Sequence, residues 1–544
     1  MRLTPSLAVL LAACAGDVPT RTDTQPASVF DSGPSSEDEL DGGSRDHDDG
    51  GDDDSPRDAS SHARDAGHTA PRDAGVDAAL PPGPCSAGNE SLVETLSITE
   101  LSLYQAVKIP LFAEEEWVTD RPAPVVQNKQ ALVRLFIKPL TGYAPHEVLG
   151  ILTLTNGSEM TMLEAKLTPR SASVESDLES TFNFSVPAAA LGTNTEISAS
   201  VVEVKCDPKR KPNLRARTPS SGSEPLDATE IGTLRLVLVP VRVGNFVPDT
   251  SATLVDGLRS AFLAHYPVPK VDVSLAPMMS WNYAVTSSGQ GWSELLAAIT
   301  RQRQNDDVED DVYYLGLVAP ARRRSDFCTG GCVSGLAPLN ITASTGDQVG
   351  LSLGFGGEST YSSAVHEIGH AHGRPHAPCG GAAGPDRKYP YPGGDIGSWG
   401  WDSRSQELIP PDVKDFMGYC EPQWISDYNY AALADRALSV NTTPLIVKSN
   451  EPSSVDSAWV RLIIYADHQA RWAGLTKREA PNGAREPLRV FDAHGALLAE
   501  LEASRTRLDH SSESFVDIPE PRASWSTIEL AGVRLSLASV LPAR

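Results

Sequence analysis

Short hydrophobic runs separated by turn-forming residues predict a β-rich region in the first half of the chain. The segments 131–137, 148–155 and 197–204 are rich in branched residues and are bounded by Gly, Pro, Asn or Ser, as is typical of strands. A Pro, Ser and Gly-rich stretch at 218–225 follows them. We therefore expect an antiparallel β domain, built as a sandwich, over residues 85–230.

Strands and helices are mixed after residue 230. The expected elements are strands at 234–243 and 312–319 and helices at 250–265 and 292–304. This mixture indicates an α/β (α+β) domain over residues 231–439. Strand patterns return at 458–466 and from residue 488, which indicates a second all-β, sandwich-like domain over 440–544. The length of 544 residues is enough for about three to four domains.

The first 16 residues have the features of an export signal. A hydrophobic stretch at 7–13 follows one basic residue, and small residues lead to Cys14. The sequence Leu-Ala-Ala-Cys at 11–14 resembles the bacterial lipoprotein box, which implies a lipid on Cys14 and a membrane contact through that lipid only. An ordinary cleaved signal peptide is the alternative. We expect an exported protein, either a cell-surface or outer-membrane lipoprotein of a bacterium or a secreted one.

Negative charge is concentrated behind this signal. Residues 17–84 contain 17 acidic and five basic residues, a net charge of −12 within a total of −25. With so few hydrophobic residues this segment is expected to be a disordered acidic linker. Its Asp-rich core at 46–54 lacks the ligand spacing of an EF-hand, so a structural Ca²⁺ is unsupported. The net negative charge opposes binding to phosphate backbones and disfavours a nucleic-acid partner.

Seven cysteines fit an oxidising compartment. With Cys14 assigned to lipid, six remain, and pairs within each expected domain are Cys85 with Cys206, Cys328 with Cys332, and Cys379 with Cys420. Cys328 and Cys332 are also half of a candidate zinc site, but no second pair of similar spacing accompanies them.

The chemistry is concentrated in His366-Glu367-x-x-His370-x-x-Gly373-x-x-His376. On a helix, the first two histidines lie about 40° apart and face the same side. Gly373 permits a left-handed residue that ends the helix, so that the chain can return the third histidine to the same point. The opposite side is hydrophobic and is expected to pack into a core. It consists of Tyr361, Ala364, Val365, Ile368 and Ala371. His372 falls on that side and is expected to pack rather than bind metal.

Three neutral imidazoles are the ligands of a catalytic Zn²⁺ with one open position. Water in that position has its pKa lowered to about 7, and the neighbouring Glu367 can accept its proton. This arrangement predicts metal-assisted hydrolysis of a carbonyl compound such as a peptide.

The extended motif resembles that of the metzincin metalloproteases. Members of that family carry a Met-containing turn below the zinc, and the segment Asp-Phe-Met-Gly-Tyr-Cys supplies Met417 and Tyr419 here. The resemblance implies that His366, His370 and His376 bind zinc, that Glu367 is the general base, and that Met417 lies under the metal. It also implies strands along the upper rim of the cleft within 346–355 and a terminal helix after Ser426. Tyr419, if it is not a core residue, is implied to bind the metal or the oxyanion.

The resemblance also places a specificity wall in the Gly-rich segment between His376 and Met417. Its candidate residues are Tyr389, Tyr391, Trp399 and Trp401.

We therefore expect a monomeric, surface-tethered zinc endopeptidase whose partner is a protein or glycoprotein substrate. Two alternatives stay open at this point. One is an adhesin or binding lipoprotein with an inert metal site. The other is a zinc hydrolase acting on a non-peptide amide.

Overall fold

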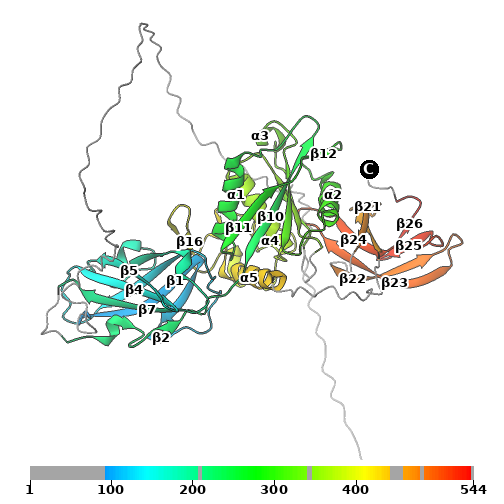
Figure 1. Cartoon of the computed structure of the whole chain (residues 1–544). Coiled ribbons are helices and arrows are strands. Elements are labelled where there is room, and N and C mark those ends of the chain that lie inside the picture. The colour runs from blue at the N-terminus through cyan, green and yellow to red at the C-terminus, as the bar shows by residue number, and fades with distance from the viewer. Residues whose placement is uncertain (1–91, 206–210, 340–345, 442–457, 478–482, 541–544) are drawn as a thin grey trace, which may run out of the picture. The chain divides into compact units, whose positions relative to one another are not determined.

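The computed structural model describes residues 92–205, 211–339, 346–441, 458–477 and 483–540 (Figure 1). These residues all fall within one compact unit, 73–544. The expected signal peptide with Cys14, the acidic linker 17–84 and the pair Cys85 and Cys206 lie outside the described residues.

Two antiparallel sheets form the N-terminal β region. One has the order β17-β16-β1-β3-β6 with β2 beside β1, and the other has the order β5-β4-β7-β8 with β9 beside β7. Gly150 on β4 lies against the ring of Phe182 on β6, and a Cβ at Gly150 would come within 2.6 Å of that ring. The two sheets therefore pack face to face, and the expected sandwich is present. Its strands are β1 (Leu96–Ala113), β2 (Glu116–Trp117), β3 (Ala131–Pro139), β4 (Val148–Asn156), β5 (Glu159–Leu167), β6 (Phe182–Val186), β7 (Thr195–Glu203), β8 (Arg217–Thr218) and β9 (Glu224–Pro225).

Two strands of the first sheet come from much later in the chain. β16 (Gly400–Asp402) pairs antiparallel with β1, with Ala106 opposite Trp401, and β17 (Glu407–Ile409) pairs with β16. The largest cluster of buried side chains likewise runs from Leu92 to Ala437. The sequence-predicted boundary at residue 230 is thus crossed by a continuous sheet and a continuous core.

The central sheet has the order β11-β10-β13-β15-β14 with β12 beside β10. Its first four strands are parallel, and β14 is antiparallel at the edge of the sheet within the described residues. The segment 346–355, expected to supply strands along the rim of the cleft, contains the single strand β15, which lies one position in from that edge. The strands are β10 (Thr233–Val243), β11 (Lys270–Leu275), β12 (Met279–Trp281), β13 (Val312–Val318), β14 (Gly335–Leu336) and β15 (Val349–Leu353).

Helices cover both faces of this sheet, because alternate residues of its strands are hydrophobic on both sides. Tyr313, Leu315 and Leu317 of β13 belong to the same buried cluster as α1 and α4, whereas Tyr314 and Val318 belong to that of α2. The helices are α1 (Ala252–His265), α2 (Trp292–Asn305), α3 (Arg324–Phe327), α4 (Glu358–Ala371) and α5 (Asp427–Asn441). Both helices expected upstream of the motif are confirmed as α1 and α2.

The C-terminal region is a seven-stranded antiparallel sheet of order β21-β20-β24-β23-β22-β25-β26. Its strands are β20 (Ala458–Ile464), β21 (Ala470–Lys477), β22 (Ala484–Phe491), β23 (Leu497–Arg507), β24 (Ser514–Pro519), β25 (Thr527–Leu530) and β26 (Val533–Ser536). Arg461 on β20 is buried, and its guanidinium contacts Asp347 at 2.7 Å and Asp517 at 2.7 Å. Since Asp347 lies two residues before β15, this buried ion pair joins the C-terminal sheet to the central one.

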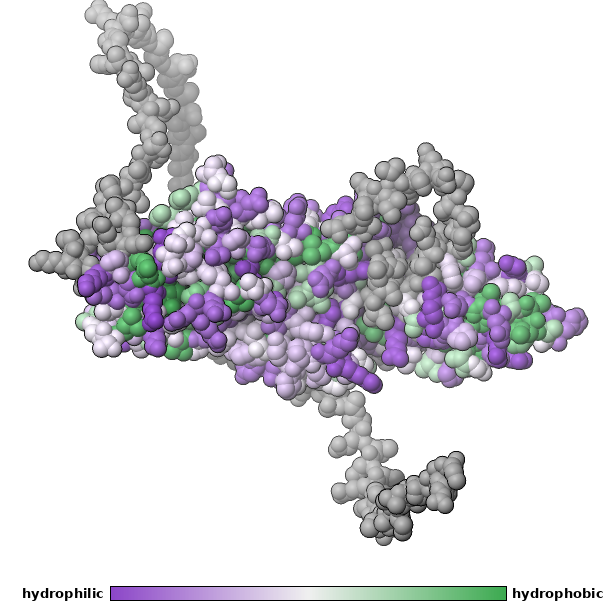
Figure 2. Space-filling model, turned by 90° about the horizontal axis from the view of Figure 1, so that it is seen from below, coloured by the Kyte–Doolittle hydropathy of each residue, from purple (hydrophilic) through white to green (hydrophobic). Residues whose placement is uncertain are grey.

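The face of the molecule in Figure 2 is mainly hydrophilic, with separate hydrophobic patches. Among the described residues, no helix is both long enough and hydrophobic enough to cross a bilayer.

Candidate metal centre

Helix α4 presents the first two histidines of the motif because one of its sides is hydrophobic, and a glycine just after its end lets the chain turn back. Ala364, Val365, Ile368 and Ala371 are all at most 2% exposed, as expected, and Tyr361 is partly buried against α1. Gly373 has a φ of 87°, its N–H binds the carbonyl of His370 at 2.8 Å, and the next N–H binds that of Gly369 at 3.0 Å. These two bonds form the Schellman ending that glycine favours, and the chain can then turn back.

The three expected ligand histidines converge in the structure. The Nε2 atoms of His366 and His370 are 3.0 Å apart, and the ring of His376 lies at centroid distances of 5.5 and 4.7 Å from theirs. All three residues are at most 8% exposed.

Each of these rings is oriented by a backbone carbonyl. The Nδ1 atoms of His366, His370 and His376 lie 2.8, 2.6 and 2.7 Å from the carbonyl oxygens of Phe416, Arg374 and Ala383. A carbonyl only accepts, so the neutral rings carry their proton on Nδ1 and turn unprotonated Nε2 atoms toward one another.

The turn around Met417 supports this arrangement from below. Met417 is fully buried, and its sulfur lies against Gly369 of α4, where a Cβ would come within 2.5 Å of it. Its carbonyl accepts a hydrogen bond from the N–H of Ala377 at 3.0 Å. The turn therefore holds both the helix and the segment that carries His376.

Both disulfide pairs that fall within the described residues are present. Cys379 bonds to Cys420 and Cys328 to Cys332. The first links the segment after His376 to the end of the turn around Met417.

A fourth group, which the sequence analysis did not indicate, lies next to the three histidines in the structure. Asp509 lies in the turn between β23 and β24 of the C-terminal sheet and is 2% exposed. Its Oδ2 is 3.6 Å from His366 Nε2 and 3.2 Å from His370 Nε2, and its Oδ1 is 2.7 Å from His376 Nε2. Asp509 belongs to no local motif, so only the tertiary fold reveals its position.

Tyr419 and His510 complete the cluster. The Tyr419 hydroxyl lies 2.9 Å from His376 Nε2 and 3.0 Å from His510 Nδ1, and the two rings stack at a centroid distance of 4.8 Å. Tyr419 is thus in direct contact with His376, one of the three converging histidines.

The donor set fits a divalent metal ion. Ligand atoms around a tetrahedral zinc with bonds of about 2.0–2.1 Å are about 3.3–3.4 Å apart, close to the 3.0, 3.2 and 3.6 Å that separate the atoms of His366, His370 and Asp509. Asp509 Oδ2 is also buried without a well-aligned hydrogen bond from any described residue. Unprotonated nitrogens and a carboxylate facing one another repel unless a cation lies between them. His366, His376, Asp509 and His510 each offer one such atom, all within 4.8 Å.

Glu367 lies beside these donors and is 1% exposed. Its Oε1 is 3.7 Å from His510 Nε2, and its Oε2 has no hydrogen-bond partner among the described residues. Gly335 of β14 makes room for this carboxylate, since a Cβ there would lie 2.2 Å from Oε1.

Burial and the facing charges shift the pKa values in this cluster. Burial, with a smaller contribution from Asp509, raises the pKa of Glu367 well above its usual range. Burial lowers the pKa of His370 to about 4. Burial alone would raise the pKa of Asp509, but the surrounding imidazoles hold it well below its usual range.

The remaining candidates have structural contacts. His372 stacks on Tyr313 at 4.3 Å and bonds to the carbonyl of Ile368, which confirms that it packs. Trp399 and Trp401 pack with Tyr104 and Leu132 of the N-terminal sheet. These contacts place both tryptophans against the N-terminal sheet, and their interpretation as wall residues stays a prediction.

The two tyrosines of the same segment are also held by packing and hydrogen bonds. Tyr389 donates to the carbonyl of Asp395 and Tyr391 to the carboxylate of Asp427.

Comparison with known proteins identifies the type of this site. Residues 340–423 match the family model described as Peptidase M66, and this segment includes the motif and the turn around Met417 but not Asp509. A stretch of 200 residues is 24% identical to Dictomallein-1 of Dictyostelium discoideum. That match covers 34% of this chain and 32% of the relative, about a third of its length. Residues 340–423 are thus similar to a metallopeptidase family.

Proposed function

We propose that the protein is a zinc-dependent endopeptidase with a metzincin-like catalytic core. The observation that carries this proposal is the convergence of three Nδ1-anchored histidines beside Glu367, within the segment that matches a peptidase family. A divalent cation at this place supplies Lewis acidity toward a peptide carbonyl and lowers the pKa of water.

The residues of the chain have distinct roles in this proposal. Glu367 takes the proton of the attacking water on its carboxylate and passes it to the leaving amine. Tyr419, whose hydroxyl lies 2.9 Å from His376 Nε2, donates a hydrogen bond to the oxygen that gains charge. Met417 and the carbonyl of Phe416 fix the orientation of the ligand helix and of His366.

The proposal also extends to the location of the enzyme. A lipid on Cys14 and the acidic segment 17–84 would tether the catalytic part at a cell surface, where extracellular proteins or glycoproteins are its substrates. The sequence of the first 16 residues and the cysteine content support this location.

Cleavage of casein tests the proposal. Because Asp509 lies over the histidines, the wild type and Asp509→Ala are assayed together, each with and without Glu367→Ala and with a chelator. We expect cleavage in the Asp509→Ala background and its loss, by about 10²-fold or more, on replacing Glu367 or removing metal. Metal-loaded Asp509→Ala protein that cuts nothing, or that cuts equally well without Glu367, contradicts the proposal.

One observation favours a second candidate function. Four protein ligands close a metal site, and closed sites are the structural type. With Asp509 in place a bound metal would be inert, which favours the alternative of a binding lipoprotein. Casein cleavage by the Asp509→Ala protein decides between the two candidates.

A further inference from the structure

We infer that Asp509 is the fourth protein ligand of the metal centre and that the C-terminal sheet thereby holds the peptidase in a latent state. This inference rests on the proposed function for its regulatory meaning, but the ligand assignment can be tested without it. The chain regulates itself with a residue that lies outside the matched peptidase segment.

The first support is the position of the carboxylate. Oδ2 of Asp509 completes a set of donor atoms with His366 and His370, and Oδ1 is 2.7 Å from His376. A carboxylate in this place occupies the position that the attacking water and the substrate carbonyl need.

The second support is the backbone of the same segment. The N–H of Leu339 bonds to the carbonyl of Arg507 at 3.0 Å, the N–H of Asp509 bonds to that of Ala337 at 2.9 Å, and Pro338 forms an antiparallel bridge with Leu508. Residues 337–339 directly continue edge strand β14, beside Glu367. Extended peptides commonly add to such an edge, so residues 507–509 lie where a substrate strand would bind.

The turn that carries Asp509 is shaped for this contact. His510 has a φ of 52°, a left-handed conformation that is uncommon for a residue other than glycine. Its ring stacks on Tyr419, and its Nε2 lies 2.8 Å from Asp509 Oδ2. The backbone turns directly after Asp509, and this turn places the His510 ring against Oδ2 of the Asp509 carboxylate.

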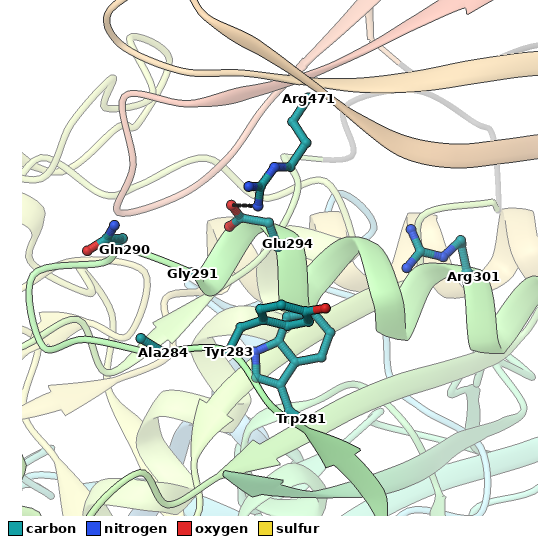
Figure 3. A pocket seen from close by; sticks show the side chains of 8 residues that line it. All are labelled: Trp281, Tyr283, Ala284, Gln290, Gly291, Glu294, Arg301 and Arg471. Atoms are coloured by element: carbon teal, nitrogen blue, oxygen red, sulfur yellow. Dashed lines mark hydrogen bonds and ion pairs between the residues drawn. The ribbon is translucent and has the colours of Figure 1, made fainter. Parts of the chain in front are cut away.

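Contacts elsewhere hold the C-terminal sheet against the catalytic part. Besides Arg461 and Asp347, Arg471 of β21 pairs with Glu294 of α2 at 3.2 Å, as Figure 3 shows. Arg471 and Glu294 line a cavity of about 150 Å³ together with Trp281 and Tyr283. A larger groove of about 950 Å³ extends from this region to His510. The interface thus combines these two ion pairs with a buried hydrophobic cluster, in which Ile463, Leu508 and Phe515 of the C-terminal part pack with α2. These contacts hold the turn with Asp509 against the histidines.

Hydroxamate binding to cobalt-substituted protein tests the ligand assignment. The full chain is loaded with one Co²⁺ and titrated with acetohydroxamate, with the visible spectrum as the readout. We expect no spectral change in the wild type and saturable binding in Asp509→Ala, because only the variant has a free position. We also expect the variant to release Co²⁺ to a chelator about 10-fold faster or more.

Ser512→Ala is the matched control, since Ser512 is exposed in the same turn. It should behave as the wild type does. Asp509→Asn keeps the shape of the side chain, so it gives a second measurement if Asp509→Ala folds poorly. It should also bind acetohydroxamate more tightly than the wild type. Equal affinity of the wild type, Asp509→Ala and Asp509→Asn for acetohydroxamate overturns the assignment.

Casein cleavage then separates the two proposals. Cleavage that rises at least 10-fold in Asp509→Ala supports latency. Acetohydroxamate binding that is gained in Asp509→Ala without any cleavage leaves the ligand assignment standing and overturns the endopeptidase. Cleavage and acetohydroxamate binding that are the same in wild type and variant leave the endopeptidase standing and overturn the role of Asp509.

Discussion

At the scale of single residues, the site depends on glycines that give space to reactive groups. Gly369 admits the sulfur of Met417 under the helix, and Gly335 admits the carboxylate of Glu367 beside the sheet edge. A methyl group at either position would displace a side chain that the motif needs.

Gly335→Ala tests this dependence on space. The new Cβ would lie 2.2 Å from Glu367 Oε1 and would push the carboxylate away from the histidines. We expect casein cleavage, measured in the Asp509→Ala background, to fall about 10–100-fold, because a displacement of about 1 Å costs that much. Bound metal, measured by elemental analysis, should stay at one ion per chain. Gly495→Ala is a control because a Cβ at this turn meets no atom within 4 Å, although its φ of 80° adds local backbone strain. Unchanged cleavage in Gly335→Ala would contradict the assigned position of the base.

At the scale of elements, the turn around Met417 and the start of α5 are joined by one buried carboxylate. Asp415 accepts hydrogen bonds from the N–H groups of Met417 and Ser426 at 2.8 and 2.9 Å and from the Asn429 side chain at 2.7 Å. Ser426 caps the helix through the N–H of Asn429 at 3.1 Å, as the sequence predicted. The helix and the floor of the metal site are therefore one structural unit.

Removing this carboxylate should destabilise both elements together. We expect Asp415→Ala to lower the free energy of unfolding by about 3 kcal/mol, since it leaves buried N–H groups without an acceptor. The measurement is urea denaturation followed by tryptophan fluorescence. Asp415→Asn retains one acceptor oxygen and should lose less. Equal stability of Asp415→Ala and the wild type would show that these hydrogen bonds are replaced by others.

The elements themselves were largely predictable, and the assembly of the site was not. Local patterns predicted β3, β4, β7, α1, α2 and α4, because hydrophobic periodicity and helix caps depend on residues close together in the sequence. Asp509 and the pairing of Trp401 with Ala106 depend on contacts between residues more than a hundred positions apart. The periodicity of a segment carries no information about such contacts. The position of Asp509 and the packing of Trp399 and Trp401 on the N-terminal sheet could therefore be found only from the three-dimensional structure.

At the scale of the whole molecule, Lys129 connects the N-terminal β region to the helical layer. It is buried, and its ammonium donates to the carbonyls of Leu263, in the last turn of α1, and Val268. Burial lowers the pKa of Lys129 to about 7. The unfolded chain therefore binds a proton that the folded chain lacks between about pH 7 and 10.

This difference gives the stability a defined pH dependence. Because the unfolded state holds more protons in that range, the free energy of unfolding should rise with pH, by at most about 1.4 kcal/mol per unit. Lys129→Met removes the titrating group, so the difference between wild type and variant should grow in favour of the wild type from pH 7 to 9. Urea denaturation at each pH measures it. Parallel curves would mean that Lys129 stays charged in the folded protein.

The pairing of β16 with β1 has a practical consequence for anyone who wishes to express the peptidase alone. A fragment that starts at residue 231 would strip β16 of its hydrogen-bonding neighbour and uncover Trp401 to solvent. β16 lies in the segment that connects His376 to the turn around Met417. The exposed strand edge would therefore be part of the segment that joins two elements of the metal centre. A usable fragment has to begin before Leu96.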